Sequence, residues 1–262
     1  MNFEKLVGFT EAGDPAQQQN WANSAIERKL GGVVCITKNP LACWDDLARL
    51  RKANIPVILH ATVTGWGGTQ MEPGAPHPAA AITAAAALAK AGLVRSVILR
   101  IDPIIPTPEG CDRAVWVARL GWRLGLKQVR FSLLHLYAHR RQEVLAALSE
   151  ESKAHLLQAY GKKTRPSAKY AEAVARRLDP LAKAGVSFSA CATEEIKRDY
   201  IKHCGCIDTD DLTILGIEAN EIKKLERNKQ GRKGCACLAL KNELLNTKKQ
   251  CAHKCAYCYW KG

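Results

Sequence analysis

The chain alternates between short runs of β-branched and apolar residues and longer segments whose apolar residues recur at helical spacing. Each short run ends in polar residues or a turn. We expect strands at residues 5–10, 32–37, 56–64, 96–102, 128–134 and 186–191, and helices such as 40–53, 78–91 and 112–124 between them. This alternation predicts an α/β fold of six strand-helix units, with a parallel sheet and right-handed crossovers. The pattern leaves open whether the sheet curls into a barrel.

Polar residues cluster where the predicted strands end, and parallel α/β folds bind their ligands at that edge. The residues to weigh are Thr37, Lys38, Asn39, Thr62, Thr64, Arg100, Asp102, Ser132, His135, Cys191 and Glu194. For a single Thr or Ser, helix capping or a surface position is the simpler explanation. Arg100 and Asp102 alternate along one strand, so they share a face. They form either a structural ion pair or a ligand contact.

The character of the chain changes after Cys191, where it becomes polar, charged and rich in cysteine. This segment has no long apolar run with which to bury a core of its own. Metal-ligand bonds supply folding free energy that a small apolar core lacks. We therefore divide the chain into a strand-helix domain at residues 1–191, which the resemblance described below implies to be a partial barrel, and a metal-dependent tail at residues 192–262 that packs on it.

Composition narrows the class of protein. A hydrophobic content of 47% over 262 residues argues against disorder and suffices for a sizeable core. No run approaches the roughly 18 apolar residues of a membrane-spanning helix, and the first residues lack a basic segment followed by a long apolar one. We expect a soluble cytoplasmic protein with no membrane partner. Its 11 cysteines then favour metal or redox chemistry over disulfides.

The formal charge of +14 is concentrated in one segment. Between Arg113 and Lys183 there are 15 Lys/Arg and 5 Asp/Glu, which contribute +10. A basic surface there would attract the phosphates of a nucleic acid or nucleotide. The alternative is a set of solvated helix faces, because the segment lacks the aromatic interleaving of a single-strand stacking platform. Oligonucleotide binding that weakens steeply with salt would support the first interpretation.

The last three cysteines follow a C-x3-C-x2-C spacing with aromatic residues behind it. They are Cys251, Cys255 and Cys258. Three thiolates hold three irons of a [4Fe-4S] cluster and leave the fourth iron open to a small molecule. A structural zinc site needs four ligands, and His253 is flanked too tightly to supply the fourth easily. The spacing therefore favours a catalytic cluster.

The remaining cysteines divide into two groups. A complete tetrahedral set for zinc or for a second iron-sulfur cluster is offered by Cys191, Cys206, Cys235 and Cys237, and Cys204 is able to replace any one of them. The sequence does not choose between zinc and a cluster. The three in the strand-helix region are expected to be small core residues: Cys35, Cys43 and Cys111.

The terminal motif resembles the cluster motif of the radical S-adenosylmethionine (radical SAM) superfamily, whose core is a partial barrel of six strand-helix units. In most of that superfamily the motif follows the first strand, whereas here it stands near the end of the chain. This layout is similar to that of an uncharacterised bacterial family of domain-of-unknown-function proteins, which carry a radical-SAM-like cysteine cluster at the C-terminus.

That resemblance covers almost the whole chain. It shows at residues 37–40, 62–67, 100–104, 191–192, 206–208, 232–237 and 251–260. The sequence departs from the family at residues 11–14, where Glu-Ala-Gly-Asp stands in place of the usual Arg-Thr-Asp, so a substrate contact there is expected to differ. Several of these segments also look, more weakly, like spore photoproduct lyase, a radical SAM enzyme that repairs a DNA lesion.

The resemblance implies a partial (β/α)6 TIM-type barrel whose cysteine-rich tail carries the [4Fe-4S] cluster. It implies an oxidoreductase or lyase that cleaves S-adenosylmethionine to a 5'-deoxyadenosyl radical, with electrons from a partner such as flavodoxin or ferredoxin. The expected contacts to S-adenosylmethionine are Thr37, Lys38, Asn39, Thr62, Thr64, Arg100 and Asp102. Tyr137 and Cys191 are candidate hydrogen donors to a substrate radical. The substrate is unknown, with a nucleic acid or nucleotide as one candidate.

A second hypothesis is a nucleic-acid-binding protein whose cysteine tail is a structural zinc module. This hypothesis explains the positive charge of the segment between Arg113 and Lys183 better than the enzyme hypothesis does. It explains the three-cysteine loop worse, because a closed zinc site needs a fourth ligand there.

Overall fold

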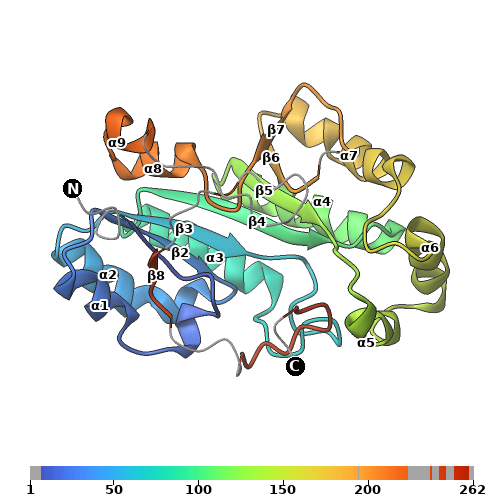
Figure 1. The fold of residues 1–262 in the computed structure, drawn as a ribbon, viewed down its shortest axis with the longest axis horizontal. Helices are drawn as coiled ribbons and strands as arrows, with labels where there is room; N and C mark the ends of the chain where they lie inside the picture. Colours follow the sequence, from blue (N-terminus) through green and yellow to red (C-terminus); the bar gives the residue numbers. More distant parts are fainter. Residues whose placement is uncertain (1–6, 194, 224–236, 238–241, 246–250, 260–262) are drawn as a thin grey trace.

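The computed structural model describes residues 7–193, 195–223, 237, 242–245 and 251–259. In this part of the chain the strands form one sheet in the order β7-β6-β5-β4-β3-β2-β1-β8, with every neighbouring pair parallel (Figure 1). The strands are β1 (Val7–Phe9), β2 (Gly32–Thr37), β3 (Val57–Thr62), β4 (Ser96–Ile104), β5 (Gln128–Leu133), β6 (Ser187–Cys191), β7 (Ile201–Cys204) and β8 (Asn242–Glu243).

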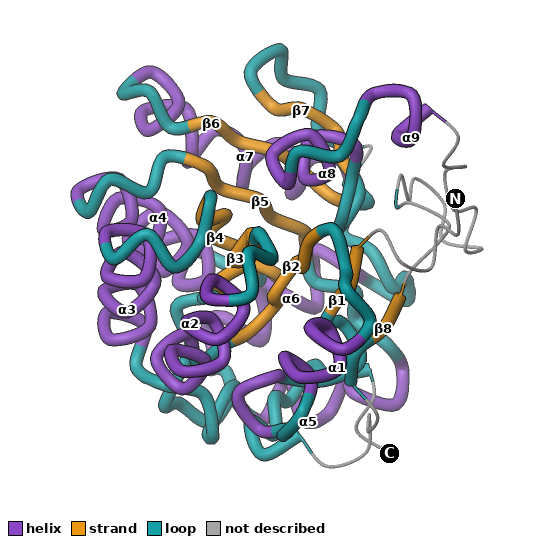
Figure 2. Tube along the Cα trace, turned by 90° about the vertical axis from the view of Figure 1, so that its left-hand side faces the viewer, coloured by secondary structure: helices purple, strands orange, loops and turns teal. Residues whose placement is uncertain are grey.

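Helices connect the strands and lie on both faces of the sheet. They are α1 (Trp21–Glu27), α2 (Trp44–Lys52), α3 (Pro78–Lys90), α4 (Pro108–Arg123), α5 (Arg141–Ala146), α6 (Glu150–Tyr160), α7 (Ala168–Lys183), α8 (Thr209–Leu215) and α9 (Ala219–Lys223). Figure 2 shows α2, α3 and α4 on one side of the curved row of strands and α8 on the other. This is a partial TIM-like barrel, and the predicted fold class is confirmed.

Local sequence signals explain where several elements begin and end. All six predicted strands are present, and β2 spans the predicted residues 32–37. α3 and α4 each begin at a proline, after the capping side chains of His77 and Thr107. The segment 141–160 forms two helices, α5 and α6, rather than one, because the Ser149 hydroxyl caps the start of α6.

Side chains alternate between two faces of the sheet. On the outer face, which the connecting helices cover, residues such as Leu59, Leu99 and Phe131 pack in a core shared with those helices. Inner positions in the first half of the strands, such as Val34 and Ile58, pack against α8. Farther along the same strands the inner positions become polar: His60, Thr62, Arg100, Asp102, Arg130 and Ser132. The barrel interior is therefore apolar at one end and polar at the carboxyl edge.

The structure differs from the sequence prediction in what the chain beyond Cys191 contributes. β7 and β8 extend the sheet at its two edges. Leu212 and Leu215 of α8, with Ile207, are buried against the inner face. These few apolar residues complete a surface that the strands provide, so no long apolar run was needed. No helix in the described residues has the length and apolar character required to cross a bilayer.

A buried ionic cluster anchors α8 to the inner face. Asp208 and Asp211 form a capping box at the start of the helix. Arg130 donates to the two carboxylate oxygens of Asp211, at 2.8 and 3.0 Å, and to the carbonyl of Cys206 at 2.7 Å. Nε2 of His60 lies 3.5 Å from Asp211 Oδ1. Burial lowers the pKa of His60 to about 4, against the opposing effect of Asp211 and assisted by the positive charges of Arg130 and Arg100.

We expect His60 to make the protein less stable as the pH falls from 7.5 to 5. In the unfolded chain histidine takes up a proton near its ordinary pKa of 6.5, whereas folded His60 stays neutral until about pH 4. The unfolded state then binds more protons, which costs about 2 kcal/mol of stability at pH 5. Urea unfolding at both pH values measures this loss. The His60→Leu variant should lack this part of the pH dependence and the His203→Gln control should keep it. The same pH dependence in wild type and His60→Leu would contradict the assignment.

Candidate metal centre and adjoining cavity

A cavity of about 290 Å³ opens at the carboxyl edge of the sheet. Strand-end side chains line it, including Arg100, Asp102, Ser132 and Cys191. A second hollow of about 190 Å³ lies at the ends of β2 and β3. Glu11, Tyr257 and Cys258 line both spaces, so the two adjoin. This is the edge at which parallel α/β barrels place their active sites.

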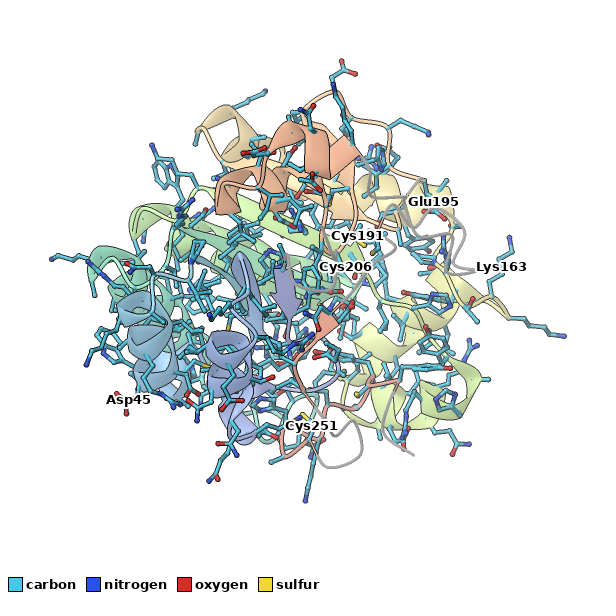
Figure 3. The ribbon with its side chains drawn as sticks, turned by 60° about the vertical axis from the view of Figure 1, so that its left-hand side comes forward. Asp45, Lys163, Cys191, Glu195, Cys206 and Cys251 are labelled. Atoms are coloured by element: carbon cyan, nitrogen blue, oxygen red, sulfur yellow. The ribbon has the colours of Figure 1, made fainter. Side chains whose placement is uncertain are left out.

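Three cysteines from separate segments meet beside the larger cavity. Cys191 ends β6, Cys206 follows β7, and Cys237 lies beyond α9. Their sulfur atoms all lie within 4.8 Å of one another, and those of Cys191 and Cys206, which Figure 3 shows together, are 3.2 Å apart. Contact with the sulfurs of Cys206 and Cys237, together with burial, raises the pKa of the Cys191 thiol well above its usual range. Three thiolates at these positions need a cation, and this donor set fits a thiophilic metal ion.

The structure bears differently on the other two cysteines of the predicted tail set. Cys235 lies outside the described residues. Cys204 is buried at the end of β7, and its sulfur is not among those that gather within 4.8 Å. Of the predicted tail ligands that the structure describes, Cys191, Cys206 and Cys237 come together.

The terminal cysteine loop, residues 251–258, has a different geometry. Cys251, Cys255 and Cys258 all line the smaller hollow. Within the part of the chain that the structure describes, their sulfurs do not gather within 4.8 Å as the first three do. Separated thiols around one hollow fit a cluster in which each iron takes one cysteine better than they fit a single ion.

His253 attaches the terminal cysteine loop to the strand ends. Its Nδ1 donates to the carbonyl of Gly74 at 2.9 Å, and its Nε2 lies 2.7 Å from Asp14 Oδ2. Because a carbonyl and a carboxylate only accept, both ring nitrogens are donors and the ring is an imidazolium. Burial opposes this charge, but the hydrogen bond and charge of Asp14 raise the pKa of His253. His253 is therefore not a metal ligand in this arrangement.

A buried ion pair holds the same loop at a second point. Nζ of Lys38 lies 2.9 Å from Glu72 Oε1 and 3.0 Å from the Tyr257 hydroxyl, which also donates to Glu72. The Thr64 hydroxyl donates to Glu72 at 2.6 Å. Burial opposes both charges, yet the pairing raises the pKa of Lys38 and lowers that of Glu72. Burial raises the pKa of the Cys255 thiol to about 12, and the Lys38 charge, beside the hollow that Cys255 lines, acts in the opposite direction.

Arg100 and Asp102 form an ion pair in the wall of the larger cavity. Ser132 donates to the same carboxylate. Burial disfavours the charge of Arg100, but the Asp102 carboxylate raises its pKa. The buried Nε of Arg100 has no hydrogen-bond partner among the described residues. The pair is thus both a structural ion pair and part of the cavity lining.

The structure divides the predicted cofactor contacts between two positions. The cavities are lined by Thr37, Lys38, Thr62, Arg100, Asp102, Tyr137 and Cys191. Thr37 also donates to Asp14 at 2.6 Å, and Thr64 is committed to Glu72, so both belong to the contacts that hold the terminal cysteine loop. Asn39 lines neither cavity, and its backbone N–H donates to the Thr37 hydroxyl.

The sequence analysis missed three residues that hold the loop. Asp14, Glu72 and Tyr257 were not singled out, although each is buried or half-buried and hydrogen-bonded. Glu72 carried a signal, since it is the only acidic residue between positions 63 and 77. A lone carboxylate in an apolar loop indicates a buried partner.

Four aromatic rings gather at the rim of the larger cavity. The rings of His135 and Tyr137 stack with centroids 4.4 Å apart, and Tyr259 lies 4.9 Å from Tyr137. His139 lies 5.7 Å from Tyr137. His135, Tyr137 and His139 belong to the basic segment itself, and the fold adds Tyr259 from a distant part of the chain.

The fold and the site define an α/β protein with a partial TIM-like barrel and a cysteine set able to bind a metal. The chain belongs to the family described as Domain of unknown function (DUF1848), whose model matches residues 4–260. A comparison with curated proteins finds no match.

Among solved structures, the chain is similar to Rhizobium etli pyruvate carboxylase T882A with the allosteric activator acetyl coenzyme A. The likeness covers 68% of this chain at 12% identity, with a TM-score of 0.31. This chain spans 19% of the length of that one. So distant a likeness transfers no activity.

Proposed function

We propose that the protein is an iron-sulfur enzyme of the radical SAM type, with a [4Fe-4S] cluster held by Cys251, Cys255 and Cys258. The observation that carries the proposal is the position of these three separated thiols around one hollow at the carboxyl edge of the barrel. When bound, such a cluster supplies the electron that cleaves S-adenosylmethionine to methionine and a 5'-deoxyadenosyl radical.

The chain's own residues then hold the cluster-binding loop, orient the ligands and keep water out of the site. Asp14 and His253 fix the terminal cysteine loop, and Lys38 brings a positive charge beside it. Arg100, whose side chain lines the larger cavity, pairs with a ligand carboxylate in this proposal. Tyr137 lines the same cavity and is the candidate hydrogen donor to a substrate radical.

The larger cavity is the proposed substrate site. Its rim offers stacked rings, including Tyr137 and Tyr259, and Arg165 lines it as well. Aromatic faces with a neighbouring cation suit a nucleobase with its phosphate, which supports a nucleotide or nucleic acid as substrate. The reductant in this proposal is a flavodoxin or ferredoxin.

The alternative, a nucleic-acid-binding protein with a structural zinc tail, is favoured by one observation. The sulfurs of Cys191, Cys206 and Cys237 are close enough for a single ion. That site leaves the terminal cysteine loop and its hollow without a role.

Anaerobic reconstitution with iron and sulfide tests the proposal. Wild type should bind about four irons at the terminal cysteine loop and release 5'-deoxyadenosine when dithionite and S-adenosylmethionine are added. Cys255→Ala should lose that iron and the product, because one of three ligands is gone. Cys111→Ala, a buried cysteine away from the site, is the matched control and should keep both. A wild-type protein that binds only zinc and releases no 5'-deoxyadenosine would sink the proposal.

A further inference from the structure

The close approach of Cys191, Cys206 and Cys237 is a tertiary feature that no local motif explains. Residues 191, 206 and 237 are 15 and 31 positions apart, yet their sulfurs all lie within 4.8 Å of one another. Cys191 and Cys237 are almost fully buried, and so is Cys206. Three soft donors converging from three segments form a metal site rather than a chance contact.

The spacing of the sulfurs indicates one ion rather than a cluster. A tetrahedral ion with metal-sulfur bonds of about 2.3 Å holds its sulfurs about 4 Å apart. Cysteines that bind different irons of a [4Fe-4S] cluster are held farther apart, at roughly 6 Å, because the irons themselves are separated. Every pair in the set lies within 4.8 Å, which is closer than ligands of different irons and fits a single ion.

Contacts around the three cysteines hold them in place without an ion. The backbone N–H of Cys206 donates to the sulfur of Cys237 at 3.2 Å. Arg130 donates to the carbonyl of Cys206 at 2.7 Å, and the Thr193 hydroxyl donates to the carbonyl of Cys191 at 2.8 Å. Such surrounding hydrogen bonds orient ligands and tune a bound metal.

The set borders the larger cavity. Cys191 and Cys206 line that cavity, and Cys258 of the terminal cysteine loop lines it as well. No fourth cysteine, histidine or carboxylate among the described residues joins the three. An ion with three protein ligands keeps a position for water or substrate, as catalytic zinc sites do.

We propose that Cys191, Cys206 and Cys237 bind one zinc ion and that its fourth coordination position faces the 290 Å³ cavity, where a donor atom of the substrate replaces water. The metal site stands on its own geometry, and its role as a substrate anchor rests on the proposed function. A substrate with an anionic oxygen or sulfur donor, such as the phosphate of a nucleotide, would bind to the zinc at one wall of the cavity that Cys258 lines. The ion would then orient the substrate toward the terminal cysteine loop.

Metal analysis of the full chain purified without oxygen tests the ligand set. Wild type should hold about one zinc per chain in addition to iron, and Cys206→Ser should lose at least about four-fifths of the zinc. Cys255→Ala should lose iron and keep its zinc, which separates this site from the proposed function. Cys43→Ser, a buried core cysteine, should change neither metal. Wild type without zinc, or with a disulfide between Cys191 and Cys206, overturns the proposal.

X-ray absorption at the zinc edge tests whether the fourth coordination position of the ion is open. It uses the wild-type protein, so its result does not depend on whether a variant folds. We expect three sulfurs and one lighter atom, and a change to four sulfurs when 2-mercaptoethanol is added. The Cys235→Ser variant should give the same spectrum as wild type. Four sulfurs before the thiol is added, or no response to it, would show a closed site, and iron neighbours would show a cluster. Each of these results overturns the proposal.

Discussion

Replacing Gly74 with alanine should displace the terminal cysteine loop and remove most of its iron. A Cβ atom at Gly74 would lie 2.0 Å from the carbonyl oxygen of Ala252, far inside any permitted contact. Gly74 also exchanges two hydrogen bonds with His253, through its N–H at 3.1 Å and its carbonyl at 2.9 Å. The added methyl group therefore separates two backbones that have no room to move apart without breaking these bonds. We expect iron at this loop to fall from about four per chain to below about one.

Gly68→Ala is the matched control, because Gly68 lies with Gly74 in the connection between β3 and α3. Its φ of +78° makes alanine strained by about 1 kcal/mol, but the methyl group meets no atom within 4 Å. This variant should keep its iron, and circular dichroism should show a folded barrel in both. Iron analysis after anaerobic reconstitution is the measurement. Full iron retention in Gly74→Ala would show that the loop does not dock as described.

Replacing Arg130 with methionine should cost the fold about 3 to 5 kcal/mol. Arg130 is the cation for the buried Asp211 carboxylate, to which it donates two hydrogen bonds, and Asp208 lies 3.7 Å away. Methionine fills similar volume but leaves both carboxylates buried without a positive partner. The variant also loses the donor to the Cys206 carbonyl, so zinc content should fall with stability.

Arg177→Met provides the comparison for an exposed pair. Arg177 and Asp112 are both more than half exposed, so removing this ion pair should change stability by less than about 1 kcal/mol. Guanidinium unfolding followed by circular dichroism compares the two variants with wild type. If Arg130→Met were no less stable than Arg177→Met, the ionic cluster would not hold α8 as the structure implies.

The strands were predictable because their pattern is local. The run at residues 32–37 is β-branched and bounded by turns, and it forms β2 over those residues. The strand at 96–102 was predicted to end at Asp102, but β4 continues to Ile104 because it pairs with Leu133 of β5 beyond a register shift. A pairing partner on another strand is not visible in the local pattern.

The sequence predicted where the residues of the candidate site lie, but it did not predict which groups in the protein they contact. Polar strand ends identified Lys38 and Arg100, and both line the cavities. The cofactor contact expected of Lys38 stays a prediction, and within the protein Lys38 binds Glu72 and Tyr257. Those partners lie 34 and 219 positions away, so only the fold brings the ion pair together.

The sequence by itself determined the order of strands and helices and the spacing of Cys251, Cys255 and Cys258, since both depend on neighbours within a few residues. The tertiary structure decided which other cysteines meet. From the sequence, Cys204 and Cys206 were equivalent, yet only the sulfur of Cys206 joins Cys191 and Cys237. The physical reason is that β7 ends at Cys204, so Cys206 lies beyond the strand, where the hydrogen bond that Arg130 of β5 donates to its carbonyl helps to fix its position.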